Sequence, residues 1–207
     1  MKRALLCLLA CATLGCAIGD PSRASLARAE ADSDFESYKM RRVGLVPFAG
    51  RTLDREHGHT LQAAFLHEFA KNGTFEVVML DEQALAEVEH SEPYRRGRLK
   101  PRTVLELSER FSLDGILMGT VTHMNAYPPQ VLGVELDLVS TETGLPIWSS
   151  RLQIDASDVR VREGLLAHAR KQEQSGNPDG GSLALISPTR FARFAASEVA
   201  RTLPCEL

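Results

Sequence analysis

The chain has 207 residues, of which 43% are hydrophobic and 25% are charged, so it can form one domain with its own core. This composition excludes a disulfide-stapled miniprotein and a disordered chain. Because 24 basic residues stand against 27 acidic ones, for a net charge of −3, the chain lacks the cationic field of nucleic-acid binders, and nucleic acid is not an expected partner.

The first residues have the layout of an export signal. Lys2 and Arg3 form a positive n-region, and the stretch from residue 4 to residue 18 is apolar and uncharged. Within that stretch, the sequence ATLGC over 12–16 resembles the lipobox of bacterial lipoproteins, although Thr13 stands where the lipobox usually has leucine. The resemblance implies a signal peptide over 1–15, followed by acylation of Cys16, palmitate included, as the first mature residue.

Two alternatives to this processing remain open. Cys11 also follows a lipobox-like LLA sequence, but it would leave an apolar stretch of only about seven residues. Cleavage at the A-x-A site over 27–29 would instead give a soluble periplasmic or secreted protein.

With Cys16 acylated, Ala17 takes the place where an aspartate signals inner-membrane retention in enteric lipoproteins. The expected location is therefore the outer membrane, facing the periplasm.

The remaining chain divides into a tether and one domain. Residues 16–40 lack hydrophobic periodicity and predict a flexible tether. Residues 41–207 alternate strand and helix patterns and then change to consecutive strands. We expect strands over 42–48, 74–80, 114–125, 130–139 and 145–154, and helices over 58–71, from 82, over 103–111, 158–172 and 188–203. This order predicts a single-domain α/β sandwich, with a mixed sheet of order βαβαβββ and C-terminal helices packed on it.

Three local signals set the limits of these elements. Gly73 is a typical helix stop after Asn72, and Asp81 is placed to cap the helix that follows it. Gly144 closes a tight turn between the last two strands.

Several short motifs occur in the order typical of one family. They are VGLVPF over 43–48, FEVV over 75–78, LDGILMGTV over 113–121 and LVSTETG over 138–144, with Trp148 four residues later. This order resembles the curli-secretion lipoprotein (CsgG-like) superfamily, which includes the amino-terminal domain of TolB and lipoproteins that activate penicillin-binding proteins. The resemblance implies a non-enzymatic envelope protein. Gly115 and Gly119 are expected to let a helix approach the sheet, and Trp148 to cover the sheet near its hairpin end.

One group of residues invites a metal interpretation. Asp54, Glu56, His57 and His59 lie between the first strand and the first helix, and His and carboxylate side chains bind zinc. His57 and His59 are weak candidates, because a third ligand is not defined. The alternative is a solvated loop that caps the helix. No phosphate-loop, dinucleotide or hydrolase-elbow motif occurs, so we expect neither catalytic residues nor a cofactor.

A basic segment is the candidate partner-binding site. It contains Arg95, Arg96, Arg98, Lys100 and Arg102, in a chain that is otherwise acidic. Such a cluster can contact an acidic protein surface or an anionic envelope polymer, but it also suits a solvated loop. Cys205 is either a free thiol or a link between chains in an oxidising compartment, which leaves a homo-oligomer open.

The sequence therefore predicts a membrane-anchored, non-catalytic interaction or assembly module of the bacterial envelope, with envelope proteins as partners. A periplasmic ligand-binding module and a hydrolase are the alternatives.

Overall fold

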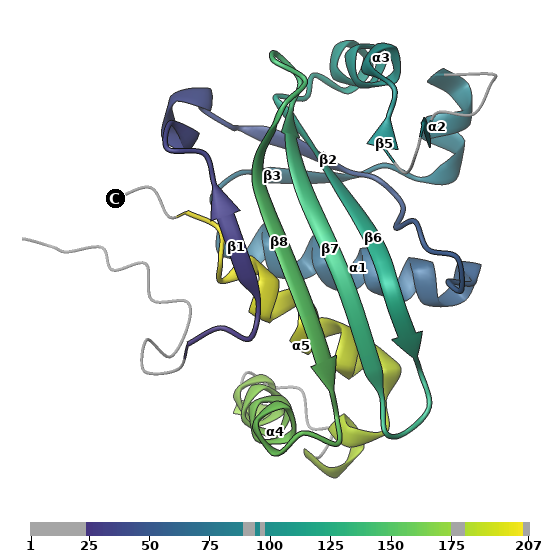
Figure 1. Ribbon diagram of the computed structural model, residues 1–207, viewed down its shortest axis with the longest axis vertical. Helices are drawn as coiled ribbons and strands as arrows, with labels where there is room; N and C mark the ends of the chain where they lie inside the picture. Colours follow the sequence, from purple (N-terminus) through teal and green to yellow (C-terminus); the bar gives the residue numbers. More distant parts are fainter. Residues whose placement is uncertain (1–23, 89–93, 96–97, 175–180, 205–207) are drawn as a thin grey trace, which may run out of the picture.

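A computed structural model describes residues 24–88, 94–95, 98–174 and 181–204. No helix within these ranges is both long and apolar enough to span a membrane. The main element is a six-stranded mixed sheet with the order β1-β8-β7-β6-β2-β3 (Figure 1). Its strands are β1 (Arg28–Ala31), β2 (Arg42–Leu45), β3 (Glu76–Met79), β6 (Gly115–Asn125), β7 (Val131–Ser140) and β8 (Pro146–Asp155).

The sheet joins a parallel part to an antiparallel part. β2 pairs in parallel with β3 and with β6, while β6, β7, β8 and β1 follow one another antiparallel. All five strands expected from the sequence are present in this sheet, and the α/β class is confirmed. A separate small hairpin is formed by β4 (Tyr94–Arg95) and β5 (Arg98–Leu99).

Five α-helices and two short 3-10 helices cover the sheet in the described ranges. They are α1 (Arg55–Asn72), α2 (Glu82–Val88), α3 (Pro101–Phe111), α4 (Val159–Gln174), α5 (Pro188–Ala200), η1 (Phe35–Tyr38) and η2 (Gly181–Leu185). α1 and α5 pack against each other on one face of the sheet (Figure 1). α2 and α3 pack on the opposite face, where a second apolar cluster includes Leu85, Val104, Leu107 and Ile116.

The expected helix limits agree with the structure. The carboxylate of Asp54 accepts from the His57 N–H at the start of α1, and Gly73 ends that helix with φ 75°. Asp81 caps α2 by accepting from the Ala84 N–H at 2.7 Å. The turn between β7 and β8 contains Gly144 with φ 69°, as expected for a residue without a Cβ.

Aromatic side chains fill the core between α1, α5 and the sheet. Trp148 is 1% exposed, lies edge-on to Phe69 with the ring centroids 6.2 Å apart, and donates its indole N–H to the Thr202 carbonyl. α5 is buried on most of its circumference, including Phe194 and Val199. The expectation that the last helix packs on the sheet is therefore confirmed.

The expected tether needs correction for its second half. Residues 28–31 form β1, which pairs with β8, and Ala27, Phe35 and Met40 are buried. The sequence Arg-Ala-Glu-Ala over 28–31 has low strand propensity and no apolar alternation, so it gives no local signal. The open edge of β8 supplies the missing hydrogen bonds, and pairing decides the conformation.

Gly119 has a different neighbour from the helix that the sequence suggested. A Cβ built at Gly119 would lie 2.2 Å from the ring of Phe48, which follows β2. That ring in turn packs on Phe65 of α1, with the centroids 4.9 Å apart. The glycine therefore accommodates an aromatic ring that links the sheet to α1.

Candidate functional site

An apolar pocket lies between α3 and the hairpin of β7 and β8. Its volume is about 250 Å³. The apolar part of its lining consists of Leu99, Pro101, Val104, Leu105, Met118, Val139 and Pro146, with Gly144 at the turn. Two large side chains at this end of the molecule are exposed to solvent, Leu105 by 55% and Leu145 by 60%. Exposed apolar side chains beside a pocket are typical of surfaces that bind another molecule.

Local sequence signals explain why these two elements form the pocket. Pro101 is the first residue of α3, where its missing N–H costs no hydrogen bond, so the helix begins directly after β5. On the other side, the hairpin turn is closed by the Gly144 N–H, which donates to the Ser140 carbonyl at 2.9 Å. The Thr141 hydroxyl ties the same turn to the Leu113 carbonyl at 2.8 Å. The hairpin wall of the pocket is therefore held by the Gly144 and Thr141 hydrogen bonds.

The rim of the pocket is acidic. Asp137 and Glu142 line it, and among its described lining residues there is no Lys or Arg. The Asp137 carboxylate accepts from the Ser149 hydroxyl at 2.6 Å. A bound group that offers a hydrogen-bond donor or a positive charge would meet these carboxylates favourably.

The basic segment predicted from the sequence adjoins this pocket. Lys100 precedes α3, and Arg102 lies in its first turn, where it pairs with Glu106 at 2.7 Å. Arg95 and Arg98 lie in β4 and β5, but their side chains, like the whole of Arg96, are outside the described residues. The basic segment beside the pocket was therefore predicted from the sequence, but the apolar pocket itself was not. Its lining comes from three separate stretches of the chain.

Beside the pocket, the outer face of β7 and β8 is polar. Arg151 and Glu135 face each other across these strands, with Arg151 Nε 3.6 Å from Glu135 Oε1. Both side chains are mostly exposed, so the pair contributes little to stability.

The candidate metal ligands have structural roles or lie apart. The Asp54 carboxylate caps α1, and its second oxygen lies 2.6 Å from His57 Nδ1. The hydrogen bond from the His57 N–H, and to a smaller extent the contact with the His57 ring, lower the pKa of Asp54. His59 is exposed and lines a smaller pocket of about 150 Å³ near Glu82. In the described ranges, no three His, Cys, Asp or Glu side chains are placed to hold a metal ion.

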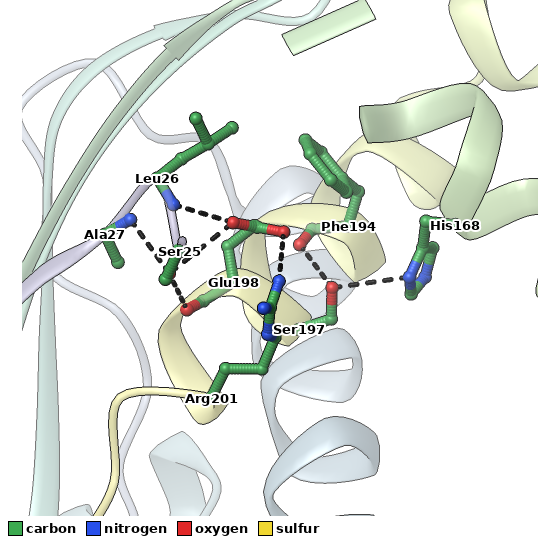
Figure 2. A network of polar contacts seen from close by, with 8 residues as sticks. All are labelled: Ser25, Leu26, Ala27, His168, Phe194, Ser197, Glu198 and Arg201. Carbon is green, nitrogen blue, oxygen red and sulfur yellow. Dashed lines mark hydrogen bonds and ion pairs between the residues drawn. The ribbon is translucent and has the colours of Figure 1, made fainter. Parts of the chain in front are cut away.

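A serine and a histidine meet between α4 and α5 (Figure 2). Ser197 Oγ lies 3.3 Å from His168 Nδ1 and donates to the Phe194 carbonyl at 2.8 Å. Gln172 Nε2 lies 2.9 Å from His168 Nε2. Because the serine proton is directed to Phe194, this network assigns the Nδ1 proton to His168, which donates to Ser197.

That direction is the reverse of what a serine nucleophile requires from a histidine base. Burial, followed by the positive charges of Lys71, Lys171 and Arg193, lowers the pKa of His168 to about 4. The neutral imidazole therefore has a packing role here, and its ring lies 5.9 Å from the ring of Phe194. The hydrolase alternative gains no support from this pair.

The start of the described chain is held to α5 by Glu198, which is 3% exposed (Figure 2). Its carboxylate accepts from the Leu26 N–H at 2.7 Å, and its backbone carbonyl accepts from the Ser25 hydroxyl at 2.7 Å. The other carboxylate oxygen lies 3.3 Å from Arg201. We call this arrangement the Glu198 clip. It fixes the point at which the N-terminal segment joins the folded body.

Fold and site together describe an α/β domain with a mixed sheet, an apolar pocket and an N-terminal segment that Glu198 holds on α5. The sequence matches no protein-family model and no curated protein. Cys16 and Cys205 lie outside the described residues.

The chain is similar to several solved structures, three of which illustrate the range. A PelC dodecamer from Paraburkholderia phytofirmans is 14% identical, with 83% of this chain and 96% of that chain covered and a TM-score of 0.46. Lipoprotein GNA1162 from Neisseria meningitidis is 16% identical, with 67% and 99% covered and a TM-score of 0.44. The LpoB C-terminal domain from Escherichia coli is 17% identical, with 56% and 84% covered and a TM-score of 0.41.

Proposed function

We propose that this chain is a lipid-anchored, non-catalytic module of the bacterial envelope that docks a protein partner at the pocket between α3 and the β7–β8 hairpin. The observation that carries the proposal is the pocket itself. It is apolar inside, acidic at its rim, and accompanied by the exposed side chains of Leu105 and Leu145. The resemblance of the sequence to the CsgG-like and TolB amino-terminal superfamily agrees with this role and stays a prediction.

The size of the pocket favours a protein side chain as its occupant. Pockets for small molecules usually enclose about 300–1,000 Å³ and bury most of the ligand. At about 250 Å³, this pocket suits one large side chain of a partner, with the exposed leucines forming the surrounding contact. A ligand-binding module, the alternative, would instead show ligand-induced thermal shifts that Leu105→Glu removes.

The docking role is tested by comparing two leucine variants in whole cells. Leu105→Glu puts a charge beside the pocket, and Leu183→Glu makes the same change at an exposed leucine of η2. After crosslinking and purification of each full-length variant, we expect Leu105→Glu to lose partners that wild type and Leu183→Glu retain. Equal recovery from both variants would count against the pocket as the docking site.

The anchor is proposed from the sequence around Cys16. Two or more acyl chains at this residue would hold the protein on a membrane more firmly than a charge cluster can, since each buried methylene contributes about 0.8 kcal/mol. Wild type should therefore resist high-salt washing, and Cys16→Ser should become soluble or remain an uncleaved precursor. Fractionation and the intact mass of the mature protein test this. A lipid-free wild-type chain that begins at Glu30 would contradict the lipid anchor.

A further inference from the structure

A single aromatic side chain projects from the loop between β6 and β7. Tyr127 is 80% exposed, the largest exposed fraction among the large apolar side chains in the described ranges. The loop is held in shape by Asn125, whose side-chain oxygen accepts from the Tyr127 N–H at 3.2 Å and whose amide donates to the Pro129 carbonyl at 3.1 Å. An aromatic side chain on a fixed loop loses little conformational entropy when it is buried, which makes it a good anchor.

Tyr127 and the pocket lie at opposite ends of the same strands. The β7–β8 turn and the β6–β7 loop lie at opposite ends of these strands (Figure 1). The pocket is formed at the turn, and Tyr127 belongs to the loop. β7, which connects the two ends, has 10 residues and so spans about 33 Å at ~3.3 Å per residue. Tyr127 therefore cannot enter the pocket of its own chain.

The pocket and this side chain are complementary in size and chemistry. An apolar cavity of about 150 Å³ admits a benzene molecule, so a cavity of about 250 Å³ has room for the phenol ring. The phenol O–H can donate to the rim carboxylates of Asp137 or Glu142. The loop segment over 123–130 contains no carboxylate of its own to repel that rim.

We propose that Tyr127 of one copy of this chain inserts into the pocket between α3 and the β7–β8 hairpin of a second copy. The contact joins two different surfaces head to tail, so each copy offers both a side chain and a pocket to its neighbours. Such contacts produce rings where the rotation closes and open filaments where it does not. The inference rests on the proposed docking role of the pocket and names its occupant.

The proposal is tested with three full-length variants purified in detergent and studied by sedimentation across a concentration series. Tyr127→Ser removes the inserted side chain, Leu105→Glu impairs the pocket, and Leu183→Glu is the control. All three replace exposed side chains, so the fold should be kept, as circular dichroism will verify. Wild type and Leu183→Glu should associate beyond the dimer, and the first two variants should each be monomeric.

Mixing the two defective variants gives a sharper result. Tyr127→Ser keeps an intact pocket and Leu105→Glu keeps its tyrosine, so one contact can form between them and no further copy can be added. The mixture should therefore sediment at about twice the monomer mass, with one chain of each kind. A monomeric wild type, a Tyr127→Ser variant that associates like wild type, or a mixture that stays monomeric would each overturn the proposal.

The cell experiment separates this inference from the proposed function. If crosslinked partners are lost from Leu105→Glu but retained by Tyr127→Ser, the pocket binds a different protein. The docking role then stands, and the insertion of Tyr127 is wrong. If neither variant loses partners, the docking role fails as well.

Discussion

Replacing Glu198 with alanine removes the acceptor that holds the start of the folded chain on α5. The Leu26 N–H would lose a hydrogen bond to a charged acceptor, which contributes about 1.5–3 kcal/mol when partly buried. The contact with Arg201, whose side chain is 23% exposed, adds up to about 1 kcal/mol. We therefore expect Glu198→Ala to lower the free energy of unfolding by about 2–4 kcal/mol.

Glu198→Gln should lower the free energy of unfolding by less, about 1–2 kcal/mol, because its uncharged amide oxygen can still accept from the Leu26 N–H. Urea unfolding measures both values, with Glu163→Ala at an exposed position of α4 as the control. Hydrogen exchange should also accelerate at the amides of β1 in Glu198→Ala, ahead of global unfolding. A loss below about 0.5 kcal/mol, or unchanged exchange in β1, would refute the clip as a stabilising contact.

Three further outcomes are expected. The free energy of unfolding should fall by up to about 3 kcal/mol as the pH drops from 6.5 towards 4. Over this range His168 takes up a proton in the unfolded chain but stays neutral in the folded one. Burial raises the pKa of Glu68, so this group contributes a pH dependence of the opposite sign. The contribution of the histidine is therefore the difference in free energy of unfolding between wild type and His168→Gln, followed over pH. A difference that does not change with pH would contradict the prediction. Gly119→Ala should lower the free energy of unfolding, measured in urea, by about 1–3 kcal/mol because the added methyl group displaces the Phe48 ring. A second substitution in the same chain, Phe48→Leu, should restore part of this loss. A Gly119→Ala variant as stable as wild type would show that the ring moves freely. Changing Arg95, Arg96 and Arg98 to Ser should weaken partner association, more so at low salt, and equal recovery from both chains would exclude the basic segment as a contact.

Signals carried by a few neighbouring residues were readable from the sequence. The cap at Asp54, the helix stop at Gly73 and the turn at Gly144 depend on local backbone geometry, and the structure contains all three. The long strand β7 was also readable, because Val134, Leu136 and Leu138 alternate with Glu135 and Asp137 on its other face.

Features that depend on distant residues were not readable. β1 forms because β8 offers an open edge, and the four residues of β1 do not by themselves indicate a strand. Glu198 lies 172 residues from Leu26 in the chain, so the clip has no local signature. The pocket likewise needs the start of α3 beside the β7–β8 turn. Sequence composition revealed only the basic segment at its border.

The Glu198 clip would also limit the distance between the folded body and the proposed lipid anchor at Cys16. Nine residue steps separate Cys16 from Ser25, where the clip holds the chain. At up to ~3.6 Å per residue, these nine steps span about 32 Å at most, whereas a tether that continued to residue 40 would span about 86 Å at most. With Cys16 acylated, the folded body would therefore stay close to its own membrane. A protein that docks in the pocket, as proposed, would then have to approach that membrane, because the anchored body could not extend far from it.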